Sequence, residues 1–221
     1  MAGLYPCSDG SKTLKRRTQI DYLPREYVLR SGQRIVIRNY NDEEDEQRFF
    51  LMIQSDSAKG NGYTVDEFPT IDCFRAVVTK DVCLAFDDVE TGRLIGYPTF
   101  NPQPVYLRSQ RRKVVEIIFS FSAQSRGKGI STEIIMLIDC LKYELGYEAL
   151  INDTFLPNYP LFRTINQTAG VSYAGMLPRY AYRFGAGWED GLIIYDDMVH
   201  SKVAMTLRAL LDENTKRAAK L

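Results

Sequence analysis

The segment around residues 113–144 most constrains the fold, because its three parts predict a strand, a tight turn and a helix in succession. Residues 113–122, Lys-Val-Val-Glu-Ile-Ile-Phe-Ser-Phe-Ser, are dense in β-branched and aromatic side chains, as is typical of a buried strand. The turn Gln124-Ser-Arg-Gly-Lys-Gly129 follows, and residues 130–144 then carry apolar side chains at three- and four-residue steps, which predicts a helix. Such a turn presents unpaired backbone N–H groups at the positive end of a helix dipole, where phosphate binds. Residues 124–131 are therefore predicted to bind a phosphate-bearing ligand.

The turn matches neither of the two best-known nucleotide-binding loops. A Walker A loop requires Gly-Lys-Ser/Thr, whereas Lys128 is followed by Gly129. A dinucleotide-binding fingerprint requires a third glycine at the position of Thr132. We therefore interpret the turn as a pyrophosphate site of a third type, although glycines after a strand also occur as plain tight turns.

Charge and hydropathy exclude several classes of function. The chain of 221 residues has 28 Lys and Arg against 28 Asp and Glu, so it lacks the excess of cations that a general nucleic-acid binder needs. Its length suits one well-buried domain. No segment approaches the roughly 18 consecutive apolar residues of a membrane span, and the first residues lack the apolar core of a signal peptide. We expect a cytoplasmic protein, with the nucleus as the alternative, that binds neither nucleic acid nor membrane.

The cysteines and histidine give no metal-binding pattern. Cys7, Cys73, Cys83 and Cys140 are far apart in sequence, and His200 is the one histidine, so no metal site is expected. We expect all four cysteines to be reduced thiols that pack as small hydrophobes.

The remaining pattern predicts a mixed sheet covered by helices. Further strands are expected at residues 33–38, 82–86, 93–97, 148–152 and 191–195, and further helices at 41–55, 68–78, 159–167 and 199–218. Pro98, Pro102 and Pro104 predict an irregular stretch or a sheet edge after residue 97. We divide the chain into a partly ordered arm (1–32), a main domain (33–198) and an amphipathic C-terminal helix (199–221), which leaves homodimerisation open.

The strand, the pattern Gln124-x-x-Gly127-x-Gly129 and the apolar helix together resemble the acetyl-CoA-binding motif of the GCN5-related N-acetyltransferase (GNAT) superfamily. The resemblance covers roughly three-quarters of the chain. The C-terminal half is also similar to the fungal acetyltransferases that act on proline analogues such as azetidine-2-carboxylate, through Asn152-Asp-Thr-Phe-Leu-Pro-Asn158, Gly175–Pro178 and Asp190–Tyr195. The resemblance implies an α/β (α+β) fold: a mixed, mostly antiparallel sheet, splayed between parallel strands at 114–122 and 147–153, with helices on both faces.

The resemblance also implies where acetyl-CoA binds. Pantetheine would lie in the splayed gap and pair with backbone groups near Phe119 to Phe121, and the pyrophosphate would lie on the amides of residues 126–130. The expected cofactor-binding residues are Phe119, Ser120, Phe121, Gln124, Arg126, Gly127, Lys128, Gly129, Ile130, Ser131 and Asn158.

Glu116 is the candidate general base, because it is the one acidic residue in an otherwise apolar strand beside the expected thioester. The alternative is that Glu116 faces solvent or pairs with a nearby cation at 111–113. The fungal relatives have asparagine at the matching position. Asn166 stands where many superfamily members carry a tyrosine acid, so Tyr173 is considered as the proton donor, although packing is the usual role of such a phenol.

Glu116, Asn152 and Tyr159 are the candidate contacts to the acceptor, because amides and phenols can orient a small polar molecule. Helix capping by Asn158 and a strand-end position for Asn152 are the structural alternatives. We expect direct acetyl transfer to the amine of a small molecule or amino acid. The alternatives are a protein lysine or N-terminal acetyltransferase and a CoA-binding regulatory module without transfer activity.

Overall fold

The computed structural model describes residues 17–64, 68–78, 81–102, 113–168 and 172–196, together with six helical positions between 206 and 217. The strands are β1 (Arg25–Val28), β2 (Arg34–Asn39), β3 (Val82–Asp88), β4 (Leu94–Pro102), β5 (Val114–Phe121), β6 (Ala149–Phe155), β7 (Ser172–Arg183) and β8 (Gly187–Asp196). The helices are α1 (Asp42–Ala58), α2 (Ile71–Val77), α3 (Ser131–Glu144) and α4 (Tyr159–Thr168), with a short 3₁₀ helix, η2 (Ala123–Ser125).

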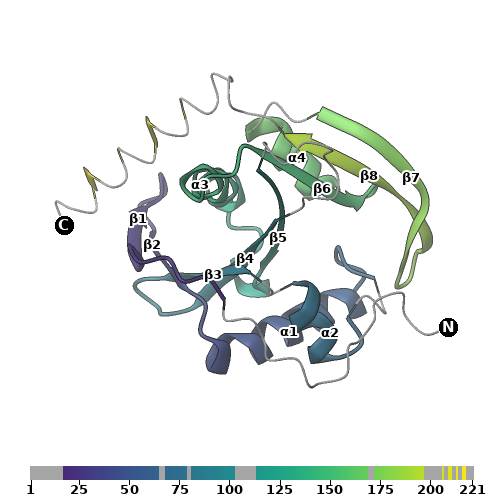
Figure 1. The fold of residues 1–221 in the computed structure, drawn as a ribbon, viewed down its shortest axis with the longest axis horizontal. Coiled ribbons are helices and arrows are strands. Elements are labelled where there is room, and N and C mark those ends of the chain that lie inside the picture. The colour runs from purple at the N-terminus through teal and green to yellow at the C-terminus, as the bar shows by residue number, and fades with distance from the viewer. Residues whose placement is uncertain are drawn as a thin grey trace.

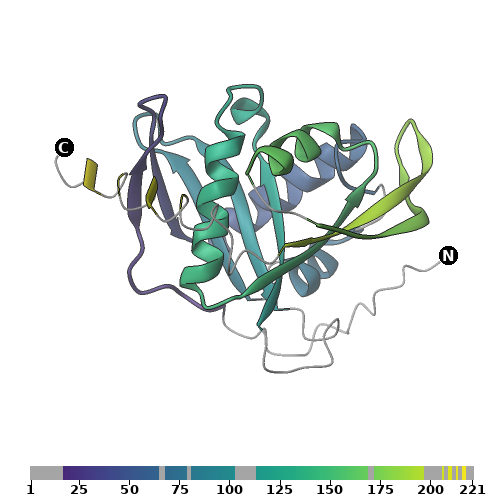
Figure 2. The same cartoon turned by 90° about the horizontal axis from the view of Figure 1, so that it is seen from above.

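The eight strands form one sheet in the order β1-β2-β3-β4-β5-β6-β8-β7. The helices α3 and α4 lie on one side of this sheet, and α1 and α2 lie on the other (Figures 1 and 2). The fold is thus the mixed, mostly antiparallel sheet between helices that the sequence predicts.

Among the described strands, β5 and β6 are the one parallel pair, and theirs is also the shortest pairing in the sheet. Paired positions join Val114 to Ala149 and Val115 to Leu150, whereas β5 pairs with β4 as far as Phe121 and β6 pairs with β8 as far as Phe155. Beyond Val115, therefore, β5 and β6 diverge and each stays with its other neighbour. The predicted splay between residues 114–122 and 147–153 is confirmed.

Alternating side chains of β5 enter two separate cores, as expected for successive residues of a strand. Val115 and Ile117 belong to a cluster with the α3 residues Ile134 and Leu137. Ile118 packs against a second cluster, built on α1 and α2 around side chains such as Phe49 and Phe74. Glu116, two residues before Ile118, is on the α1–α2 side of the sheet.

A buried polar network attaches α1 to this second face. Tyr97 of β4 donates its hydroxyl to Asp45 Oδ1 at 2.8 Å, and Arg38 of β2 donates to both oxygens of Asp45 at 2.6 and 3.0 Å. Burial alone would raise the pKa of the Asp45 carboxyl, but hydrogen bonds from Arg38, the Asn41 N–H and Tyr97 lower it below its usual value. The helix therefore has a fixed orientation under β4 and β5.

The expectation of an irregular stretch or a sheet edge after residue 97 is wrong. Strand β4 continues through Pro98 to Pro102, and it lies in the interior of the sheet, between β3 and β5. Pro98 faces Phe119 of β5, and on the β3 side the paired positions run to Cys83–Thr99 and resume at Phe86–Gly96. The missing N–H thus lies where the ladder with β3 is interrupted.

Three further expectations change. Residues 25–28 of the expected arm form β1 and pair with β2, so this part of the arm belongs to the sheet. The strand at 191–195 is longer, and its partner β7 was not predicted.

Cys83 and Cys140 are buried free thiols, but Cys73 is in a disulfide bond, so the expectation of reduced thiols is wrong for Cys73. Most of the C-terminal helix expected at 199–218, like Cys7, lies outside the described residues.

Candidate active site

The turn after β5 has the conformation that its glycines allow. Gly127 and Gly129 both have φ of 73°, a left-handed backbone conformation that other residues adopt with strain. A Cβ atom at either position would meet no atom within 4 Å, so the conformation, and not lack of space inside the protein, requires glycine here. Residues 126–129 are exposed, and the turn is therefore a surface from which backbone N–H groups can reach a ligand.

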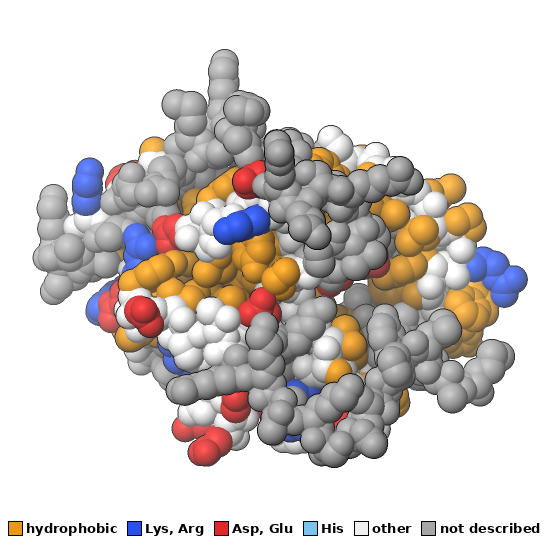
Figure 3. Space-filling view, in the orientation of Figure 1, with side chains coloured by type: hydrophobic (Ala, Val, Ile, Leu, Met, Phe, Trp, Pro, Cys, Tyr) orange, Lys and Arg blue, Asp and Glu red, His pale blue; other side chains and the backbone are white. Residues whose placement is uncertain are grey.

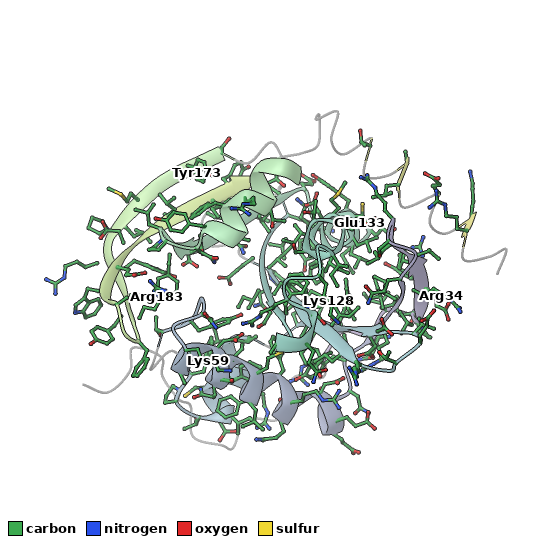
Figure 4. All side chains as sticks on the ribbon, turned by 180° about the vertical axis from the view of Figure 1, so that it is seen from behind. Arg34, Lys59, Lys128, Glu133, Tyr173 and Arg183 are labelled. Atoms are coloured by element: carbon green, nitrogen blue, oxygen red, sulfur yellow. The ribbon has the colours of Figure 1, made fainter. Side chains whose placement is uncertain are left out.

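The N-terminus of α3 adds further donors beside this turn. Ile130 at the N-cap makes no side-chain capping hydrogen bond, as an apolar residue cannot. Glu133 is the acidic residue of the first turn of α3, and both its carboxylate oxygens accept from the Arg30 N–H, at 3.0 and 3.1 Å. Figure 4 labels Glu133 on α3 and Lys128 in the turn before it. The first-turn amides of α3 are thus covered by neither a cap nor this carboxylate, and they suit an anion.

Two groups of side-chain bonds fix the turn to the rest of the protein. Arg126 donates through its guanidinium to Asp56 at the end of α1 and to the carbonyl oxygen of Phe121, at 2.9 Å for Nη2. Asp56 is 4% exposed and also accepts from Ser120 Oγ at 3.1 Å. On the other side, Ser122 Oγ donates to the Leu94 carbonyl at 2.8 Å. The turn is therefore braced by α1, β4 and β5 together.

Asn152 of β6 spans the inner end of the splay, the point just beyond Val115 where β5 and β6 begin to diverge. Its Nδ2 donates to the Ile117 carbonyl oxygen at 2.6 Å, and its Oδ1 accepts from the Ile117 N–H at 2.9 Å. One side chain thus replaces the backbone ladder two residues beyond the last strand pair. Each Asn152 polar atom keeps one further hydrogen-bonding position, so contact with an acceptor remains chemically open.

Glu116 is half-buried on β5, opposite Asn101 of β4 in the strand register. Asn101 is fully buried, its Nδ2 donates to the Val77 carbonyl at 3.4 Å, and its Oδ1 has no partner among the described residues. Thr99, two residues before Asn101 on β4, is equally buried, and its hydroxyl likewise has no partner within the described part of the chain. Glu116 therefore lies at the inner end of the splay on a polar strip that faces α1 and α2.

The opposite wall of the site is the β7–β8 hairpin, whose tip contacts the end of α1. Arg183 donates to the Gly60 carbonyl at 3.0 Å and forms an ion pair with Glu189 at 2.5 Å. Figure 4 shows Arg183 beside the end of α1, where Lys59 is labelled. A Cβ on Gly60, which has φ of 68°, would lie 2.7 Å from the Phe184 carbonyl oxygen, so glycine permits this close approach.

The β7–β8 hairpin exposes several large apolar side chains. Hydrophobic side chains gather over β7 and β8 in Figure 3. The exposed large ones are Tyr173, Met176, Tyr182, Phe184 and Trp188. Arg179 lies over the Trp188 ring, 5.4 Å from its centroid.

The structure brings together most of the predicted site residues, with some exceptions. Glu116, Asn152, Phe119 and the turn at 124–131 all border the splay. Tyr173 is on the edge strand β7, where β6 and β8 separate it from β5, so the structure does not bring it together with Glu116. Tyr173 contacts Phe162 of α4 instead, with ring centroids 6.0 Å apart.

Asn158 and Tyr159 are at the start of α4. The Asn158 side chain donates to Thr154 Oγ1 at 3.1 Å, and the main-chain carbonyl of Asn158 accepts from the Phe162 N–H, which begins the helix. Tyr159 is 72% exposed. Contacts of these two side chains with a ligand stay predictions.

Sequence reasoning missed Asp56 and Arg183. Asp56 is one of several polar residues in the last turns of α1, and nothing local marks it as the partner of Arg126. Arg183 is in a strand that the sequence pattern did not predict. Both roles depend on contacts between residues far apart in sequence, at separations of 70 and 123 positions.

Comparison with known proteins agrees with this geometry at the level of fold. The sequence matches no protein-family profile, and it matches no curated protein. Solved structures do match. A GCN5-related N-acetyltransferase from Kribbella flavida aligns at TM-score 0.62 and 15% identity, over 74% of this chain and 97% of that one. An N-acetyltransferase from Staphylococcus aureus Mu50 aligns at TM-score 0.57 and 21% identity, over 74% and 98%.

The protein yncA from Salmonella typhimurium, solved with its cofactor acetyl-CoA, aligns at TM-score 0.60 and 15% identity, over 76% of this chain and 95% of that one. The aligned share, about three-quarters of this chain, includes nearly the whole of each neighbour. The mixed, mostly antiparallel sheet of the described residues, with β5 and β6 parallel and helices on both faces, therefore has the fold of the GCN5-related N-acetyltransferases.

Proposed function

We propose that this protein is an acetyl-CoA-dependent N-acetyltransferase that transfers an acetyl group directly to the amine of a small molecule or amino acid. The observation that carries the proposal is the continuity of two features: the gap between β5 and β6 opens directly toward the glycine turn and the uncapped start of α3. Acetyl-CoA has an extended arm that carries the thioester, and this arm is joined to an anionic pyrophosphate and nucleotide. The arm would suit the gap, and the pyrophosphate would suit the turn. Solved neighbours with this fold, including one with acetyl-CoA, support the same conclusion.

The residues at the gap fit coenzyme A. The amides of residues 126–130 and the Ser131 hydroxyl would bind the pyrophosphate, and the open space outside Gly127 and Gly129 leaves room for it. The main chain of β5 at Phe119 would pair with the pantetheine amides, because β6 has already diverged there. When bound, the coenzyme supplies the acetyl thioester.

Glu116 would act on the acceptor and not on the coenzyme. An ammonium group must lose a proton before its nitrogen can attack a carbonyl carbon, and a carboxylate at the inner end of the splay is placed to accept that proton. The half-buried position of Glu116 beside the fully buried Asn101 excludes much of the surrounding water. Glu116 would then return the proton to solvent after the amide forms.

The walls of the site favour a small acceptor. The hairpin tip and the end of α1 meet at the Arg183–Gly60 hydrogen bond, which closes the side of the site where a protein tail would need an open groove. We therefore favour a free amine or amino acid over a lysine within a protein.

A CoA-binding module without transfer activity is the second candidate. The position of Tyr173 favours it, because β6 and β8 separate this phenol from β5, so Tyr173 is not placed beside Glu116 to protonate a leaving thiolate. Acetyl transfer nevertheless remains our first choice, since thiolates leave without full protonation when the amine has already formed its bond.

Two measurements test the proposal. Binding of CoA is measured by calorimetry, and thiol release from acetyl-CoA is followed with a panel of small amines and amino acids. We expect binding and turnover with at least one amine, and a fall in turnover of about 100-fold or more for Glu116→Gln. Glu26→Gln, on β1 and paired with Arg34, is the matched control and should turn over normally. Tight CoA binding with no turnover on any amine would instead identify the binding module.

A further inference from the structure

The Asn152 side chain occupies the position that a continued β5–β6 ladder would occupy. Because its amide exchanges both hydrogen bonds with the Ile117 main chain, at 2.6 and 2.9 Å, the gap begins on the far side of Asn152. The last backbone pair, Val115 with Leu150, lies directly behind it. Asn152 is thus the inner end of the splay.

The hydrogen bonds of Ile117 also set which β5 groups face the gap. Main-chain groups of alternate strand residues point to the same neighbour, so Phe119 and Phe121 direct their groups toward β6, as Ile117 does. The Phe121 carbonyl already accepts from Arg126, at 3.2 Å for Nε and 2.9 Å for Nη2. Within the described residues, the main-chain section available to an extended ligand is therefore centred on Phe119, between Asn152 at one end and Arg126 at the other.

This section fixes how far a bound arm can extend. The span from Phe121 to Ile117 is about 13 Å at the usual rise per strand residue. Since the glycine turn lies at the Phe121 end, an arm that starts there must end near Asn152. On the α3 side, Ile117 is 8% exposed and packs with the α3 cluster, so a longer arm finds no space there.

We propose that Asn152 determines acyl-chain length by closing the inner end of the donor site, so that the protein uses acetyl and other very short acyl groups and excludes longer chains. The inference rests on the proposed function and adds to it the class of donor. A longer acyl chain would have to displace the Asn152 amide, which would leave the Ile117 N–H and carbonyl unpaired and place methylene groups against a polar wall.

The chain contains a matched control for this asparagine. Asn39 of β2 makes the same two hydrogen bonds with another main-chain residue: its Nδ2 donates to the Ile20 carbonyl at 3.0 Å, and its Oδ1 accepts from the Ile20 N–H at 2.9 Å. Three strand pairings separate β2 from β5. Asn39→Ala therefore removes the same two side-chain hydrogen bonds to the main chain, but at a site away from the splay.

The test measures dissociation constants by calorimetry for CoA, acetyl-CoA, butyryl-CoA and hexanoyl-CoA, with the wild type, Asn152→Ala and Asn39→Ala. We expect the wild type to bind acetyl-CoA at least about 10-fold more tightly than hexanoyl-CoA. Asn152→Ala should reduce that ratio about 10-fold, and Asn39→Ala should leave it unchanged.

Three results would overturn the inference: a wild type that binds hexanoyl-CoA as tightly as acetyl-CoA, an unchanged ratio in Asn152→Ala, or an equal change in Asn39→Ala. The first uses the wild type alone, so it decides even where a variant does not fold. A wild type that binds no CoA compound contradicts the proposed function itself, whereas CoA binding without length selectivity contradicts only the role of Asn152.

Discussion

The Arg126 guanidinium donates to the carboxylate of Asp56, and this pair joins the glycine turn before α3 to the end of α1. Asp56 is nearly fully buried and also accepts from Ser120 of β5, whereas the Arg126 side chain is 36% exposed. Arg126, one of the two basic residues of the turn, is thereby directed inward, toward Asp56 and the Phe121 carbonyl. We infer that Arg126 shapes the turn and that the backbone amides, not this side chain, contact the pyrophosphate.

The first prediction follows from this pair. Asp56→Asn should lower the free energy of unfolding by about 1–2 kcal/mol, because a buried charge-assisted hydrogen bond is lost while Arg126 remains partly solvated. It should also weaken CoA binding about 10-fold by loosening the turn, as measured by calorimetry. Asp72→Asn is the control, since Asp72 pairs with Arg75 at 2.7 Å but is 74% exposed. Tighter CoA binding by Asp56→Asn would show instead that the freed Arg126 contacts phosphate.

The second prediction concerns the glycines of the turn. Gly127→Ala should lower the free energy of unfolding by about 1–2 kcal/mol, because alanine is strained at positive φ. Gly146→Ala is a close control: Gly146 has φ of 80° and follows the other end of α3, about 21 Å from the turn. Both variants should lose similar stability in urea denaturation, but only Gly127→Ala should weaken CoA binding. Equal CoA affinity in the two variants would remove the turn from the binding site.

Local signals were sufficient for the turn and for most elements. The strand at 114–121, the glycines and the helix at 131–144 follow from residue types within a few positions of one another, and the structure confirms them. The interpretation of Pro98 was wrong for a reason that sequence alone does not give. Pro98 faces Phe119, whose main-chain groups point away from β4, so the missing N–H costs no bond on that side.

The remaining features depend on distant partners. Eight of the twelve residues of β7 are exposed, without the alternation of a half-buried strand, and this strand exists because β8 pairs with it along most of its length. The sequence predicted that the Asn152 amide contacts the amine acceptor. Its hydrogen bonds to Ile117 depend instead on the divergence of two strands, in which the bonded residues are 35 positions apart. Sequence can nominate such side chains, whereas only the fold shows which group each one meets.

The third prediction uses a buried ionic cluster under α3. Lys142 is fully buried and contacts Asp139 at 2.7 Å and Asp196 at 3.3 Å. Burial raises the pKa of the Asp139 carboxyl from 3.8 to about 6, against the opposing effect of Lys142. A carboxyl with a raised pKa in the folded state binds a proton more readily there than in the unfolded chain, so its contribution to stability is present below pH 4 and is lost as pH rises to about 6.

Asp139→Asn should therefore abolish this component of the pH dependence. The difference in unfolding free energy between wild type and variant, measured in urea from pH 4 to pH 7, should shift in favour of the variant as pH rises and level off above pH 6. A difference that is constant with pH would mean that Asp139 titrates normally.

The last prediction separates the acceptor wall from the donor site. Arg183 bonds Gly60 through Nη1 at 3.0 Å and Glu189 through Nε at 2.9 Å, a pair of directions that the single ammonium of lysine cannot reproduce. Arg183→Lys should therefore detach the hairpin tip from α1 and raise KM for the amine about 10-fold, with the CoA dissociation constant unchanged. Arg34→Lys, at an exposed ion pair with Glu26, should alter neither value. Steady-state kinetics with the amine varied, and calorimetry with CoA, measure the two effects independently. If CoA affinity falls while KM for the amine holds, the hairpin belongs to the donor side of the splay, and the acceptor must enter between α1 and β4, where Thr99 and Asn101 present their buried polar atoms.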